Sequence, residues 1–103
     1  MNDDRLTEQL AAKVLGWKTA PGRFIKHGRA WTPRWHFAPF TKLEDAFLLL
    51  ERAASHYTLT ADKGEGFRAE VHVGTRVGEA SGKPWARTVT LALARALGLE
   101  VDS

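Results

Sequence analysis

The sequence predicts an α+β protein in which three helices pack with a small antiparallel sheet. The first observation behind this prediction is that apolar residues recur at helical spacing in three separate segments. The second is an alternating β-hairpin pattern at about residues 56–73, and the third is a set of glycines and prolines between these segments. Because 103 residues supply one modest core, we expect residues 1–103 to form a single domain.

Composition excludes several classes of protein. The chain has no cysteine, so it forms neither a disulfide nor a thiolate metal site. Its net charge of +3 is mild, which permits contact with nucleic acid without indicating it. The acidic start, Met1-Asn-Asp-Asp, does not resemble a secretory signal, and the apolar runs are too short to cross a membrane. We therefore expect a cytoplasmic protein that makes no contact with a membrane.

The first helix is expected over residues 5–15. Its apolar residues share one face, and Asp3 or Asp4 precedes it as a capping residue. Gly16 is typical of the position just past a helix end. We expect Trp17 to fold back over the end of the core rather than to form a ligand platform.

Residues 18–40 begin with a turn at Pro21-Gly22, after which residues 23–37 supply one or two short extra strands. This region mixes basic and aromatic side chains. Such a mixture would stack bases and pair phosphates in a nucleic-acid interface. In the alternative interpretation, the aromatic rings fill the core while the arginine head groups reach water.

The second helix is expected over residues 43–54. Thr41-Lys-Leu-Glu44 has the form of a capping box, in which the Thr hydroxyl and the Glu carboxylate bond to each other's backbone N–H groups. Its acidic first turn agrees with the helix dipole. Glu44 and Asp45 point about 100° apart on a helix, so a catalytic carboxylate pair is not indicated.

The hairpin is expected from strands at residues 56–61 and 67–73, joined by a turn at 62–66. If Ala61 pairs with Phe67, His56 lies across from His72. Two such histidines would share a metal ion with a carboxylate such as Glu70. The alternative, which we prefer, is a pair of ordinary polar cross-strand neighbours with no metal.

Residues 84–98 are expected to form the last and most buried helix. Pro84 suits a first helical turn, and Gly98 suits the left-handed position past the end. Its apolar band is wide enough to be covered by the rest of the domain. The preceding residues 74–83 are expected to be a polar connection, with backbone N–H groups that would suit an anion at the helix start.

The sequence indicates neither an enzyme nor a cofactor. Residues 78–84 do not form a nucleotide loop, because the glycine spacing is too short and Pro84 follows the lysine. There is no nucleophile elbow and no supported acid–base pair. The four histidines also lack the spacing of a metal motif.

The order of elements and several short motifs resemble a family of phage proteins. These motifs are Val14-Leu-Gly-Trp-Lys18, His36-Phe-Ala-Pro-Phe-Thr41 and Ala92-Leu-Ala-Arg-Ala-Leu-Gly98. Over about residues 6–101 the chain is similar to the small uncharacterised phage and prophage proteins of the phage α-β-α (ABA) sandwich domain family. The resemblance implies an α-β-α sandwich-like fold, a location in the cytoplasm of a bacterial host and an unknown phage or host protein as partner. It implies no catalytic residue, cofactor or metal.

A second resemblance concerns the C-terminal part of the chain. Phe67-Arg-Ala-Glu-Val-His-Val73, the loop up to Arg87 and the alanine-rich helix are similar to the C-terminal half of a double-stranded RNA-binding domain. This resemblance implies phosphate contacts for Lys83 and Arg87. Pro84, Trp85 and the extra helix at 43–54 depart from that pattern. A protein-interaction module is therefore the first expectation. Nucleic-acid binding is the alternative, with contacts from Arg23, Lys26, Arg29, Arg34, Lys83 and Arg87.

Overall fold

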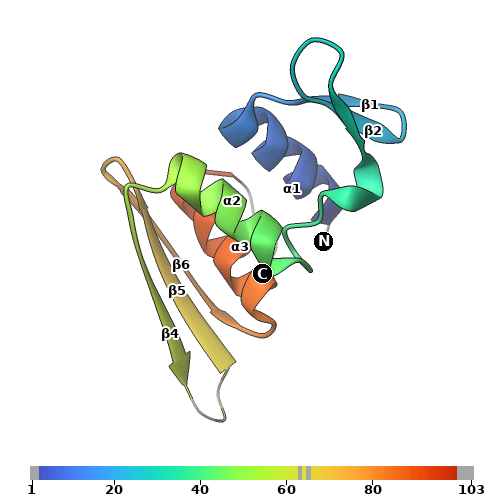
Figure 1. The fold of residues 1–103 in the computed structure, drawn as a ribbon. Helices are drawn as coiled ribbons and strands as arrows, with labels where there is room; N and C mark the ends of the chain where they lie inside the picture. Colours follow the sequence, from blue (N-terminus) through green and yellow to red (C-terminus); the bar gives the residue numbers. More distant parts are fainter. Residues whose placement is uncertain (1–2, 63, 65, 100–103) are drawn as a thin grey trace.

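In the computed structural model, which describes residues 3–62, 64 and 66–99, helices occupy the middle of the molecule and one small sheet lies on each side (Figure 1). The helices are α1 (Asp3–Leu10), which continues as the π-helix η1 (Ala11–Leu15), α2 (Leu43–Ala53) and α3 (Trp85–Ala96). The sheets have the strand orders β1-β2-β3 and β4-β5-β6. The predicted α+β class, with helices packed against small antiparallel sheets, is confirmed.

The first helix is longer at its start than predicted. Asp3 and Asp4 do not precede the helix as caps but lie in its first turn, where their negative charges interact favourably with the helix dipole. The predicted end is confirmed, because Gly16 takes the left-handed conformation with φ of 72°. There the Gly16 N–H donates to the Ala12 carbonyl at 3.2 Å.

The predicted capping box of α2 is wrong. Lys42 is the N-cap residue, and its side chain makes no capping hydrogen bond. A turn precedes the helix, in which the N–H groups of Thr41 and Lys42 both donate to the Ala38 carbonyl. The Thr41 hydroxyl donates to that same carbonyl at 3.4 Å. The Asp45 carboxylate stabilises the turn instead, because it accepts a hydrogen bond from the Ala38 N–H at 2.9 Å.

The final helix begins one residue later than predicted. Pro84 is the N-cap, with an extended ψ of 175°, so it lies before the first turn and not in it. Gly98 takes a left-handed φ of 81°, as predicted. Thr88 supports the helix start, since its hydroxyl lies 3.0 Å from the carbonyls of both Gly82 and Pro84.

The larger sheet contains β4 (His56–Asp62), β5 (Gly66–Val73) and β6 (Arg76–Gly82). The predicted hairpin register is confirmed, with Ala61 opposite Phe67 and His56 opposite His72. The prediction that residues 74–83 form a polar connection is wrong, because residues 76–82 form β6, which pairs with β5 along its whole length. Its small inward residues Gly78 and Ala80 are buried, while Glu79 and Ser81 are exposed on the other face.

The smaller sheet contains β1 (Lys18–Ala20), β2 (Arg23–Ile25) and β3 (Trp31–Pro33). Residues 23–37 thus supply two short strands, but β2 pairs with β1 and β3 pairs with β2, so neither strand joins the hairpin. Residues 34–36, which lie within the region predicted to supply these strands, form the 3-10 helix η2 (Arg34–His36), which directly follows Pro33. A turn holds the β2–β3 loop, where the Ala30 N–H donates to the His27 carbonyl at 2.9 Å.

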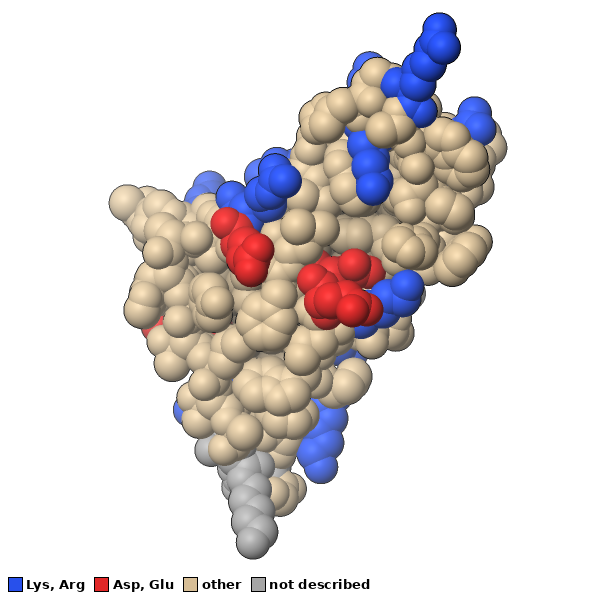
Figure 2. Space-filling view, in the orientation of Figure 1, with Lys and Arg blue, Asp and Glu red and all other residues tan. Residues whose placement is uncertain are grey.

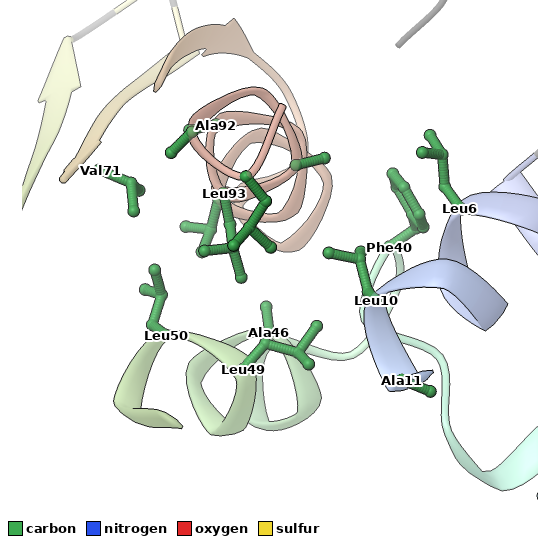
Figure 3. Close-up of a cluster of buried hydrophobic side chains, with 14 of the residues drawn as sticks. Leu6, Leu10, Ala11, Phe40, Ala46, Leu49, Leu50, Val71, Ala92 and Leu93 are labelled. Atoms are coloured by element: carbon green, nitrogen blue, oxygen red, sulfur yellow. The ribbon is translucent and has the colours of Figure 1, made fainter. Parts of the chain in front are cut away.

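One cluster of buried apolar side chains connects these elements, and Figure 3 shows its centre. α3 packs on β5 and β6, α2 packs against α3, and η1 packs against α2. The cluster also extends to Phe24 of the smaller sheet. As predicted, Trp17 covers this end of the core, with its ring 6.0 Å from Phe24 and 5.1 Å from Phe37. No described helix is long and apolar enough to span a membrane.

Candidate interaction surface

Charge is divided unevenly along the chain. Residues 9–43 contain seven Lys and Arg residues and no Asp or Glu, whereas the remaining residues contain eight basic and twelve acidic residues. These 35 residues form η1, the smaller sheet and the segment that leads to α2. Figure 2 shows blue side chains projecting from the end of the molecule that contains β1 and β2, whereas red side chains gather near α2. The smaller sheet is therefore the basic end of the protein.

An exposed tryptophan lies among these basic residues. Trp31 is 55% exposed, and the guanidinium of Arg23 lies 5.7 Å from the centre of its ring. Arg29 is exposed in the neighbouring loop, and Lys26 stacks 5.1 Å over the ring of Trp17. We call Arg23, Arg29 and Trp31 the basic–aromatic surface. Trp and Arg are among the residues most often found at the energetic centres of protein interfaces.

Two of the other predicted nucleic-acid contacts are bound to α1. Arg34 forms an ion pair with Glu8 at 3.0 Å and donates to the Asp4 carbonyl at 3.1 Å. The hydrogen bond from Arg34 lowers the pKa of the Glu8 carboxyl, and the same bond raises the pKa of Arg34. Arg87 pairs with Asp3 at 2.8 Å. Both arginines therefore join α1 to the rest of the protein.

Lys83 lies just after the end of β6, beside Gly66. The six predicted contact residues are thus distributed over several parts of the molecule. Arg23 and Arg29 are exposed on the smaller sheet and its β2–β3 loop, whereas Lys26 and Arg34 stack on the rings of Trp17 and Phe24.

A hollow of about 650 Å³ lies between the first turn of α1 and the segment after β3. Phe37 and Phe40 line it, and Trp35, which is 74% exposed, stands at its edge. The Oδ1 atom of Asp3 is buried there and has no hydrogen-bond partner among the described residues. No pattern in the sequence indicated this hollow, because its lining comes from segments far apart along the chain.

The predicted histidine pair lies on the open face of the larger sheet. The rings of His56 and His72 are 5.2 Å apart, and His72 Nε2 lies 2.7 Å from Glu70 Oε1. This hydrogen bond is the main cause of the lowered pKa of Glu70, and a hydrogen bond to Glu79 adds to it. Among the described residues, no group of three or more His, Cys, Asp and Glu side chains is placed to hold a metal ion.

The fold and this surface define a small α+β protein with a basic–aromatic end. No protein-family model matches its sequence, and no curated protein is significantly similar to it. Among solved structures, a similar one is the 2.0 Å crystal structure of a phage protein from Bacillus cereus ATCC 14579, with a TM-score of 0.77. The two sequences are 16% identical, and the match covers 99% of this chain and 93% of that one. At this identity the likeness shows a shared fold and nothing finer.

Proposed function

We propose that this chain is a non-enzymatic accessory protein of phage or prophage type that binds another protein, of the phage or of its host, in the host cytoplasm. The phage-type origin is supported by the fold that it shares with the Bacillus cereus phage protein. The binding role is supported above all by Trp31, which lies exposed under the Arg23 guanidinium. No catalytic step is included, because the sequence supplies no nucleophile with a supporting base and no acid–base pair.

The partner is expected to carry acidic groups around an apolar anchor. The basic–aromatic surface belongs to a stretch of 35 residues without a single Asp or Glu, so its cations have no acidic neighbours within that stretch. An acidic partner would gain from this charge, mostly through a faster association rate. An apolar side chain of the partner would supply the buried area by covering the Trp31 ring.

Affinity capture with matched variants tests this proposal. The tagged native chain is expected to retain a stoichiometric protein from phage-infected or lysogenic host cells. The Arg23→Ser/Trp31→Ser double variant should weaken that complex by 10-fold or more, since truncation of an interface centre costs about 2 kcal/mol or more. Arg52→Ser, at an exposed position of α2, is the control and should bind as the native chain does. Equal retention by all three chains would refute the assignment of this surface.

Nucleic-acid binding is the second candidate, favoured by the same pairing of Arg23 with the Trp31 ring. Arginine and an exposed aromatic ring are the groups that bind phosphates and stack on unpaired bases. The discriminating measurement is a fluorescence-anisotropy titration with duplex RNA, duplex DNA and single strands at about 50 and about 200 mM salt. Binding tighter than the high-micromolar range that weakens steeply with salt would favour this second candidate over a protein partner.

A further inference from the structure

The edges of the two sheets differ in how they are protected against pairing with another strand. Natural proteins protect such edges by making them short, by adding charge or proline, or by covering them. β1 and β3 contain only three residues each, and β3 ends at Pro33. β6 carries Arg76 and Glu79, and the Arg95 side chain donates to the backbone carbonyl of Glu79 at 2.6 Å. Each of these three edges therefore has at least one protective feature.

β4 is the fourth edge strand of the described sheets, and its five central residues have none of these features. Its seven residues pair with β5 in an unbroken register. Residues 57–61 contain no charged residue, no proline and no glycine. The side chains of Tyr57, Thr58, Thr60 and Ala61 are exposed, and Figure 1 shows no segment beyond β4 at the outer side of the sheet. A long, regular and uncharged edge leaves a row of backbone N–H and C=O groups available to another strand.

We propose that β4 pairs with the β4 strand of a second copy of this chain. The two strands run antiparallel about a two-fold axis through Leu59, and the two sheets join into one of six strands. This register is centred on the strand, so it uses the full length of both edges.

The sequence of β4 complements itself in this register. Thr58 lies opposite Thr60 of the second copy, which is a favourable cross-strand pair. On the other face, Tyr57 lies opposite Ala61, so that a large side chain meets a small one, and Leu59 meets its own copy. Any register shifted by one residue would place polar residues opposite apolar ones.

An apolar strip beside the edge favours the same partner. Tyr57 is 40% exposed, and its ring lies 6.4 Å from the ring of Phe47 on α2. The second copy would cover this exposed side of Tyr57. Because one strand and one apolar strip make a small interface, we expect a weak dimer with a dissociation constant on the order of 10 µM.

Analytical ultracentrifugation from about 1 to about 300 µM tests the pairing around that expected constant. The native chain should show a reversible monomer–dimer equilibrium. The Thr58→Lys/Thr60→Lys variant places like charges opposite each other across the axis and should weaken the dimer by 30-fold or more. The Val77→Lys/Ser81→Lys variant adds the same charge to exposed positions of β6 and should dimerise as the native chain does. A native chain that stays monomeric, or a dimer that tolerates the β4 variant, overturns the proposal.

Cysteine cross-linking tests the register and does not depend on the lysine variants. The chain has no cysteine of its own, so an introduced thiol has no competitor. Thr58→Cys and Thr60→Cys, mixed in equal amounts, should form a disulfide between the two variants, because directly opposite residues lie within bridging distance. Each variant alone should cross-link much more slowly. In a dimer of one variant, the two identical cysteines are offset by two residues along the paired strands, which puts their Cα atoms more than about 7 Å apart. Equal rates in the mixture and in the separate variants would overturn the register.

Discussion

Gly78→Ala is expected to be among the most damaging single-methyl changes in this protein. Gly78 lies where β6 crosses α3, and it is buried. A Cβ atom there would overlap the Ala92 carbonyl oxygen and the Ala96 amide nitrogen, and would lie 2.9 Å from Ala96 Cα. All three atoms belong to the backbone of α3, so no side-chain rotation can relieve the overlap.

The size of the effect follows from the movement that the methyl group forces. Ordinary contacts of this kind measure 3.4–4 Å, so α3 would have to retreat from β6 by about 1 Å. A gap of about that size removes a quarter to a half of the dispersion energy of each contact across it. We therefore expect a loss of about 3 kcal/mol in the free energy of unfolding, at the upper end for overpacked cores. That is a large part of the roughly 5–15 kcal/mol typical of a domain.

Urea denaturation followed by far-UV circular dichroism measures this loss. Gly74→Ala is the matched control, because Gly74 has a φ of +63° and no atom within 4 Å of a Cβ at its position. That variant carries only backbone strain, expected to cost about 1–2 kcal/mol. If Gly78→Ala loses no more stability than Gly74→Ala, the contact between β6 and α3 is not as close as described.

Two further predictions concern polar contacts. Thr90→Val should lower the free energy of unfolding, measured by urea denaturation, by about 1–3 kcal/mol. The buried Thr90 hydroxyl donates to the Pro39 carbonyl at 2.8 Å, and valine leaves that acceptor unpaired. Thr41→Val, which loses an exposed bond of 3.4 Å, should have little effect. Arg34→Met should make the free energy of unfolding depend less on pH in the acid range. The Glu8 carboxyl has a lowered pKa when folded, so its ion pair stabilises the protein above the ordinary value of 4.5 and is lost as the pH falls below it. The stability difference between native and variant chains should therefore shrink from pH 7 to about pH 2, and an unchanged difference would show that the pair contributes nothing.

Local patterns predicted the elements that carry their own signals. Gly16 and Gly98 end helices where predicted, and both take the left-handed conformation that the pattern requires. Alternation also predicted the two hairpin strands, and the register considered for them, with His56 opposite His72, is the one observed. The basic–aromatic surface was visible in part, since Arg23 and Arg29 stood out among aromatic residues. The absence of acids over residues 9–43 was the stronger signal, and a charge count along the sequence would have found it.

The amino-acid sequence by itself determined the class of fold, the three helices and the hairpin, because helical spacing, alternation and glycine ends are local properties of the chain. Only the tertiary structure decided that residues 76–82 form a strand, since Gly78 and Ala80 have little preference for a strand of their own but are small enough to lie against α3. The tertiary structure also paired Arg34 and Arg87 with Glu8 and Asp3 on α1. Contacts between side chains from distant segments depend on how the elements pack, and no short stretch of sequence determines that packing.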